Sequence, residues 1–85
     1  MQHTMAMILF LVSFERHQEE YKDALLTPAE VAERVRRPVA TVRFWRATGT
    51  GPKSANVGGR VLYKAADVEA WIEEEFAKDA AKGAA

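Results

Sequence analysis

The chain has 85 residues, of which 48% are hydrophobic, so it can form one small domain with a modest core. It contains no cysteine, which excludes disulfides and thiolate metal sites. No secretory signal is recognisable, and the apolar run over residues 6–12 is far shorter than the ~20 residues that a membrane helix needs. We therefore expect a soluble cytoplasmic protein with no membrane partner.

The charges cancel overall but are separated along the chain. Residues 34–66, which we call the basic block, hold eight of the twelve Lys and Arg residues and none of the twelve Asp and Glu residues. The block therefore carries +8, and the remaining four basic and twelve acidic residues give −8. A solvated basic face is one interpretation, but the complete absence of acids favours a surface that binds an anionic partner such as DNA.

The groups that an enzyme would need are missing. His3 and His17 are isolated and lie outside the basic block, and the chain has a single asparagine. The paired glycines match no phosphate-binding loop of nucleotide enzymes, and the acidic run 73–75 has the pattern of a solvated helix face. We expect no enzymatic activity, no cofactor and no metal.

The first 24 residues do not predict a single structure. Apolar residues within 5–12 recur at helical spacing, whereas the continuous run 8–12 would equally suit a buried strand. Residues 15–24 are polar and rich in helix formers, so we expect a helix there. We treat residues 1–24 as an N-terminal extension, largely helical, that either adds to the core or mediates self-association.

A first well-marked helix begins at Thr27 and runs to about Val35. Thr27 is a favourable N-cap, Pro28 suits the first helical position, and Glu30 can complete a capping box. The residues just ahead of the cap, Leu25 and Leu26, are expected to pack on the core.

A second helix is predicted to begin at Pro38, whose missing N–H costs nothing at a helix start. It should end at Gly49, which suits the left-handed residue that closes many helices. Only residues 36–38 separate the two helices, and so tight a connection predicts a helix-turn-helix.

A β-hairpin and a last helix are expected to follow. Residues 53–57 and 60–64 are β-prone, and Gly58-Gly59 between them can take the positive φ angles of a two-residue turn. The last helix should begin at Ala65 or Ala66, with Asp67 in its first turn where the helix dipole favours a carboxylate. The predicted fold is mainly α with a small β-hairpin: a winged helix-turn-helix over residues 25–76, followed by a frayed tail over residues 77–85.

The second helix has two different faces. One side is expected in the core: Val39, Val42 and Trp45. The opposite side is expected outside: Ala40, Phe44 and Ala47. The small alanines would let the helix enter a major groove, which is about 12 Å wide. Phe44 either contacts a thymine methyl group or a sugar in that groove, or covers part of the hairpin.

The basic residues suit contacts to a DNA backbone. Arg36 and Arg37 lie beside the N-terminus of the second helix, whose free N–H groups favour a phosphate. Arg43 can reach a guanine edge or a phosphate, whereas Arg46 should pack its stem and extend its head toward the backbone. The hairpin tip can approach the backbone or the minor groove closely. The predicted DNA-binding residues are Arg36, Arg37, Ala40, Thr41, Arg43, Phe44, Arg46, Ala47, Lys53, Ser54, Asn56, Gly58, Gly59 and Arg60.

Six short segments in order carry a family resemblance: LLTPAEVAERV, the turn, TVRFWR, TGTGP, VGGRVLY and DVEAWIEE. Across residues 25–75 the chain resembles the excisionase-type DNA-binding domains of phages and prophages, a MerR-like winged-helix group. The resemblance implies DNA binding by the second helix and the wing, often by several copies along one site. It also implies DNA bending and, together with an integrase, excision of an integrated element, although other members of the group regulate transcription.

The turn departs from the pattern of this group. Where its members usually have Gly and then an apolar residue, this chain has Arg36 and Arg37. If Arg36 adopts a positive φ, it carries a cost that Gly would not. Our hypothesis is a non-enzymatic excisionase, a recombination directionality factor that acts on DNA together with an integrase. The alternatives are a small transcriptional regulator of a mobile element and a winged helix used for protein–protein contact.

Overall fold

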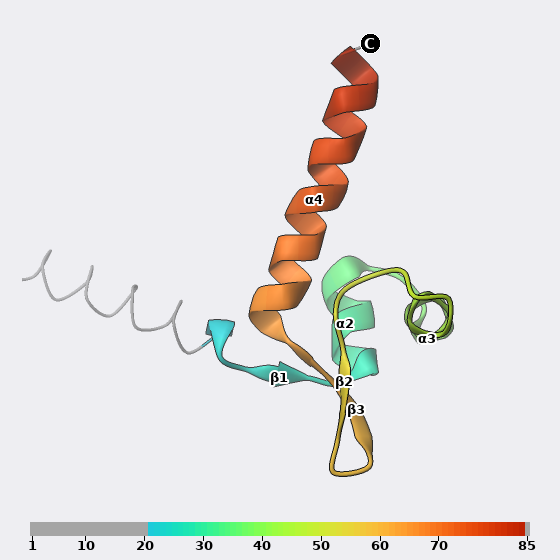
Figure 1. The fold of residues 1–85 in the computed structure, drawn as a ribbon, viewed down its shortest axis with the longest axis vertical. Helices are drawn as coiled ribbons and strands as arrows, with labels where there is room; N and C mark the ends of the chain where they lie inside the picture. Colours follow the sequence, from blue (N-terminus) through green and yellow to red (C-terminus); the bar gives the residue numbers. More distant parts are fainter. Residues whose placement is uncertain (1–20, 85) are drawn as a thin grey trace, which may run out of the picture.

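The computed structural model describes residues 21–84, and the predictions made for residues 1–20 lie outside this range. Its elements form a helix-turn-helix, a small sheet and a long last helix (Figure 1). Their bounds are β1 Leu25–Leu26, α2 Pro28–Val35, α3 Val39–Ala47, β2 Ala55–Val57, β3 Arg60–Lys64 and α4 Ala65–Ala84. This order agrees with the predicted winged helix-turn-helix.

Helix α2 begins at the predicted capping box. The Glu30 backbone N–H donates to the Thr27 hydroxyl at 3.2 Å, and the Thr27 backbone N–H donates to the Glu30 carboxylate at 2.9 Å. The helix ends in a Schellman motif, in which the Arg37 N–H donates to the Ala32 carbonyl at 3.0 Å. Arg36 is the left-handed residue of this motif, with φ 57° and ψ 48°, so the conditional expectation of a positive φ at Arg36 is confirmed.

Helix α3 begins one residue later than predicted. Pro38 is its N-cap, with extended backbone angles of φ −59° and ψ 147°, and Val39 is the first helical residue. Proline favours this position as well, because the N-cap N–H is not part of the helix and the extended ψ is compatible with its ring. The end is as predicted: Gly49 has φ 74°, and the Thr50 N–H donates to the Trp45 carbonyl at 2.8 Å.

The wing is the predicted hairpin, with a shorter first strand. Gly58 and Gly59 have φ values of 58° and 92°, and Val57 pairs with Arg60 on either side of them. The first strand is β2, which starts at Ala55 instead of residue 53. Residues 53–54 are not paired with β3, because this part of the chain still runs beside α3.

A third strand was not predicted. The short strand β1 pairs with β3 in antiparallel register, Leu25 opposite Lys64 and Leu26 opposite Tyr63, and the sheet order is β1-β3-β2. This pairing ties the start of the helix-turn-helix to the base of the wing. The position of the wing relative to α2 is therefore fixed through the backbone.

The core lies where α2, α3, β3 and α4 meet. Its fully or nearly fully buried residues are Val31, Ala32, Val42, Tyr63, Ala65 and Val68. Val39 and Trp45 pack against this cluster from α3, as predicted. The Trp45 ring also contacts the Trp71 ring of α4, with ring centroids 5.0 Å apart and an angle of 46° between the planes.

Helix α4 corrects the expected frayed tail over residues 77–85, because it continues to Ala84. The segment is built mainly from Ala, Lys and Asp, and it contains no proline, so local propensity allows the helix to continue past its last core contacts. Figure 1 shows this helix extending well beyond the rest of the fold. Within residues 21–84, no helix is both long and apolar enough to cross a membrane.

Candidate nucleic-acid interface

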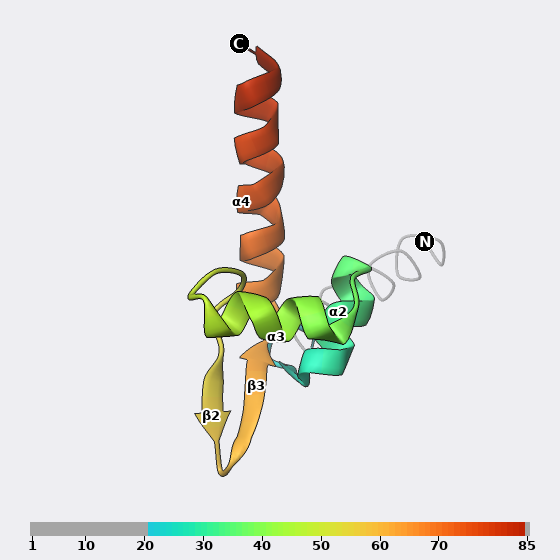
Figure 2. The same ribbon diagram turned by 90° about the vertical axis from the view of Figure 1, so that its right-hand side faces the viewer.

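Helix α3 and the wing lie on the same side of the fold. Figure 2 shows α3 across the front of the molecule with the wing extending below it, whereas α4 leaves in the opposite direction. Of the fourteen predicted DNA-binding residues, all are exposed except Thr41 and Ser54, which are half-buried. The fold therefore leaves most of the predicted residues exposed on the turn, on α3, and on the wing with the segment just before it, which together we call the basic face.

The basic block keeps most of its charge unpaired. Arg34 is the exception in the basic block: its Nε and Nη2 atoms donate to the two Glu69 carboxylate oxygens, each at 2.7 Å. The Tyr21 hydroxyl donates to the same carboxylate at 3.1 Å. Hydrogen bonding to Glu69 raises the pKa of Arg34 further. Among the described residues, the other seven cations of the block form no ion pair, so the charge available to a partner falls from +8 to +7.

The turn places two arginines at the start of α3. Arg36 and Arg37 are both exposed. Arg36 has a left-handed backbone conformation although it is not a glycine. A left-handed residue with a side chain costs about 1–2 kcal/mol. Arg36 therefore has a strained backbone where α2 ends. It lies two residues before Pro38, the N-cap of α3, and the start of α3 is where a phosphate would be bound.

Arg46 joins α3 to the wing. Its Nε atom donates to the Ser54 hydroxyl at 3.1 Å, which holds the segment before β2 against the helix. Both residues were predicted at the interface, but their contact with each other was not. Because Nε is one of several guanidinium donors, the terminal nitrogens of Arg46 can still bind a phosphate.

The wing tip is shaped by its glycines and Asn56. The Asn56 Oδ1 atom accepts a hydrogen bond from the Gly59 N–H at 2.9 Å, so this side chain stabilises the turn itself. The tip is open, since a Cβ atom added at Gly58 or Gly59 would meet nothing within 4 Å. Arg60 is exposed directly beside the tip, where it can follow a DNA backbone or enter a minor groove.

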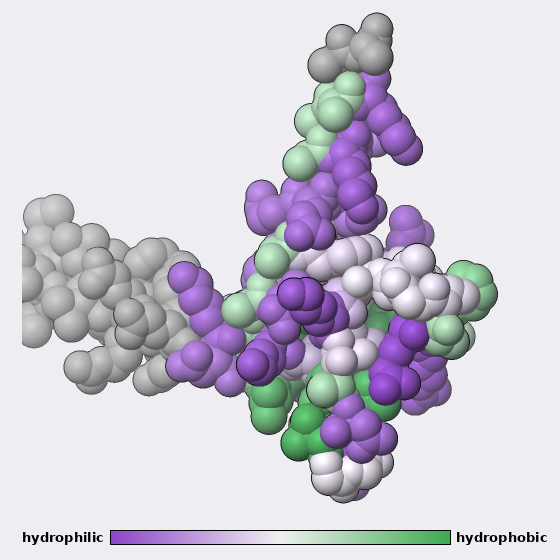
Figure 3. Space-filling model, in the orientation of Figure 1, coloured by the Kyte–Doolittle hydropathy of each residue, from purple (hydrophilic) through white to green (hydrophobic). Residues whose placement is uncertain are grey.

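The outer side of α3 is apolar as well as basic. Phe44 is 64% exposed and does not belong to the core cluster. Ala40 and Ala47 are exposed on the same side of the helix. Figure 3 shows hydrophobic surface at the outer edge of α3 beside hydrophilic surface, whereas much of α4 is hydrophilic.

Two contacts that support the site were not predicted from the sequence. Trp71 holds the back of α3 through Trp45, as described above. Gly51 has φ 78°, and a Cβ atom there would lie 2.9 Å from the Trp45 Cβ, so the loop can pass over the tryptophan only with glycine. The only sequence signal for this contact was the TGTGP segment of the family resemblance.

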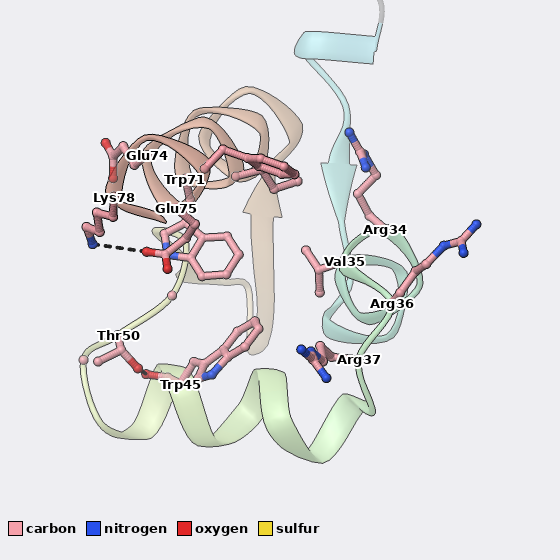
Figure 4. A pocket seen from close by; sticks show the side chains of 14 residues that line it. Arg34, Val35, Arg36, Arg37, Trp45, Thr50, Trp71, Glu74, Glu75 and Lys78 are labelled. Atoms are coloured by element: carbon pink, nitrogen blue, oxygen red, sulfur yellow. Dashed lines mark hydrogen bonds and ion pairs between the residues drawn. The ribbon is translucent and has the colours of Figure 1, made fainter. Parts of the chain in front are cut away.

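An open cleft of about 990 Å³ separates the basic face from the acidic part of α4. Figure 4 shows Arg36 and Arg37 on one side of this cleft and Glu74 and Glu75 on the other, with the Trp45 ring between them. Glu75 pairs with Lys78 of its own helix at 3.1 Å. Among the described residues no ion pair crosses this cleft to Arg36 or Arg37, so α4 does not neutralise these two arginines.

Comparison with known proteins agrees with this geometry. No curated protein and no solved structure matches the chain significantly. The family of the helix-turn-helix domain matches residues 25–75, which is more than half of the chain and includes α2, α3 and the wing. Members of this family bind DNA and are typically not enzymes. The chain belongs to the helix-turn-helix domain family, a DNA-binding family that includes excisionase-like proteins.

Proposed function

We propose that the protein is a non-enzymatic, sequence-specific DNA-binding protein of the excisionase type, which shapes DNA for excision by an integrase. The observation that carries the proposal is the basic face, whose six cations form no ion pair among the described residues and lie on or beside an exposed helix and an exposed wing. The family membership supports DNA as the partner.

In this proposal α3 enters the major groove. An α-helix with its side chains is about 10–12 Å in diameter, and the groove is about 12 Å wide. The exposed alanines on its outer side allow the backbone to approach the bases. Arg36 and Arg37 hold a phosphate at the helix start, and Arg43 reaches a base edge or a second phosphate.

The wing binds the adjacent backbone or minor groove. Arg60 lies on it and Lys53 lies just before it, and the Arg46–Ser54 hydrogen bond and the β1–β3 pairing hold it in place relative to α3. Two rigidly joined elements that grip neighbouring grooves can stabilise a bent duplex, because the larger protein–DNA interface of the bent form offsets the deformation energy. This coupling supports an architectural role, in which copies of the protein bind side by side and present curved DNA to an integrase.

The first test is a titration of duplex DNA with the full chain at several salt concentrations. Each neutralised phosphate should contribute about −0.9 to the slope of log affinity against log salt. Arg60→Ala should make the slope shallower by about 0.9 and weaken binding to all sequences, whereas Arg43→Ala should also relax sequence preference. An affinity that hardly changes with salt would show that the fold serves protein–protein contact instead.

The second test addresses the excision role. Bending of a bound fragment should be visible as a shorter distance between dyes at its two ends. Addition of the protein to the integrase of the same element should increase excision of a substrate that carries the element's ends. DNA binding without bending and without any effect on excision would favour the transcriptional regulator, which would use the same basic face.

A further inference from the structure

Phe44 is a large apolar side chain that folding leaves in water. It is 64% exposed, while the core contacts of α3 are made by Val39, Val42 and Trp45 on the other side of the helix. A single exposed apolar residue is common on protein surfaces and needs no function. The position of Phe44 is what requires an explanation, because it lies on α3 among the residues of the basic face.

The surroundings of Phe44 are small and basic. Ala40 and Ala47 lie one turn away on either side and are exposed, so two of the helix positions next to the phenyl ring carry only a methyl group. Arg43 precedes it, and no acid occurs in residues 34–66. An apolar ring on a positively charged helix suits a partner that is anionic overall but offers an apolar group where the helix touches it.

The major groove of DNA offers one such group. Its base edges carry hydrogen-bond donors and acceptors at every base pair, and the only apolar group among them is the methyl on C5 of thymine. Cytosine methylated at C5 carries the same group at the same place. Phe44 has no hydrogen-bonding atom in its side chain, so it can distinguish base pairs there only by this methyl group.

We propose that Phe44 determines specificity by contacting the C5 methyl group of a pyrimidine, thymine or 5-methylcytosine, in the major groove. The inference rests on the proposed DNA binding by α3. It adds that the target contains a methylated pyrimidine at the position of Phe44, and that loss of this methyl group lowers the affinity.

The test begins with a bound sequence selected by the full chain from random duplexes. Each thymine of the selected site is then replaced in turn by deoxyuridine, which removes only the methyl group. For the unmodified protein, one position should lose about fourfold in affinity, which corresponds to ~0.8 kcal/mol for one buried methyl group. For Phe44→Ala, thymine and deoxyuridine at that position should bind equally.

A second arm distinguishes the two sources of the methyl group. At the sensitive position, a cytosine and a 5-methylcytosine are compared in otherwise identical duplexes. A gain of about fourfold from the methylated base, lost in Phe44→Ala, extends the reading to methylated cytosine. A loss with deoxyuridine but no gain with 5-methylcytosine restricts it to thymine, and both outcomes support the inference.

Two variants serve as controls. Phe76→Ala removes another phenylalanine that is 73% exposed, on α4 and across the cleft from Arg36 and Arg37, and it should keep the full response to the methyl group. Phe44→Leu keeps an apolar side chain and should keep part of the response. All three variants should fold, because neither phenylalanine belongs to the core, and circular dichroism checks this.

The outcomes separate this inference from the proposed function. Salt-dependent DNA binding with no sensitive position above twofold in either arm overturns the role of Phe44 and leaves the proposed function intact. A preference for thymine over deoxyuridine that Phe44→Ala retains in full also overturns it, since another group would then contact the methyl. Absence of salt-dependent DNA binding overturns the proposed function itself.

Discussion

Replacing Arg36 with glycine should make the protein more stable and a weaker DNA binder. Arg36 is the single non-glycine residue with positive φ among residues 21–84, and it closes α2 at φ 57° and ψ 48°. The left-handed conformation costs a residue with a Cβ atom about 1–2 kcal/mol, which glycine avoids. The side chain is exposed, so no packing is lost.

The magnitude follows from two opposing effects. Relief of the strain contributes about 1–2 kcal/mol, and the greater freedom of glycine in the unfolded chain subtracts about 0.4–1 kcal/mol. Arg36→Gly should therefore raise the free energy of unfolding by roughly 0.5–1 kcal/mol. For a domain of this size, that corresponds to an increase in Tm of about 2–8 °C.

Urea and thermal unfolding of the full chain measure the stability. DNA titrations at several salt concentrations measure the lost phosphate contact, which should make the slope of log affinity against log salt shallower by about 0.9. Arg36→Ala is the matched control, because it removes the charge and keeps the strain: DNA binding should weaken without a gain in stability. Arg37→Gly removes the neighbouring charge where φ is not positive, and it should not stabilise the protein. A lower free energy of unfolding for Arg36→Gly would refute the reasoning.

Three further predictions concern the contacts that hold the basic face in place. Glu69→Gln should lower the free energy of unfolding by about 0.5–1 kcal/mol in urea titrations. The effect is small because the Arg34 and Glu69 side chains are 46% and 33% exposed, so water screens their ion pair. An unchanged free energy of unfolding at low salt would contradict this. Hydrogen bonds from the backbone N–H and the side chain of Thr27 lower the pKa of Glu30. The stabilisation by its carboxylate should therefore be complete above the pKa of Glu30 in the unfolded chain and lost as pH falls through the lower pKa of the folded protein. Glu30→Gln should accordingly be less stable than the unmodified protein at neutral pH, and the difference should shrink in acid; a constant difference would count against the capping box. Gly51→Ala should lower the Tm by several degrees. The φ of 78° is unfavourable for alanine, and the added Cβ atom would lie only 2.9 Å from the Trp45 Cβ. An unchanged Tm would show that the loop moves freely.

The parts of the fold that could be predicted from sequence depend on local chemistry. The capping box at Thr27 and Glu30, the left-handed Gly49 and the Gly58-Gly59 turn each involve residues within a few positions of one another. The helical spacing of Val39, Val42 and Trp45 likewise identified the buried side of α3. The exposed outer residues of α3 followed from the same helical pattern.

The parts that could not be predicted depend on contacts between distant segments. A two-residue strand such as β1 has no periodicity, and its partner lies at the far end of the wing sequence. The Arg34–Glu69 ion pair joins residues 35 positions apart, so Arg34 was counted with the free cations of the block. Pro38 suits both an N-cap and a first helical residue, and only the observed ψ of 147° decides between them.

The turn, α3 and the wing are proposed to form one DNA-binding surface, and this is the central claim. The most direct measurement is a titration of the full, ¹⁵N-labelled chain with duplex DNA, followed by the NMR signals of the backbone amides. We predict shifts concentrated in residues 36–60, and signals of residues 77–83 of α4 that stay in place. Shifts concentrated on α4, or no shifts at low salt, would contradict the claim.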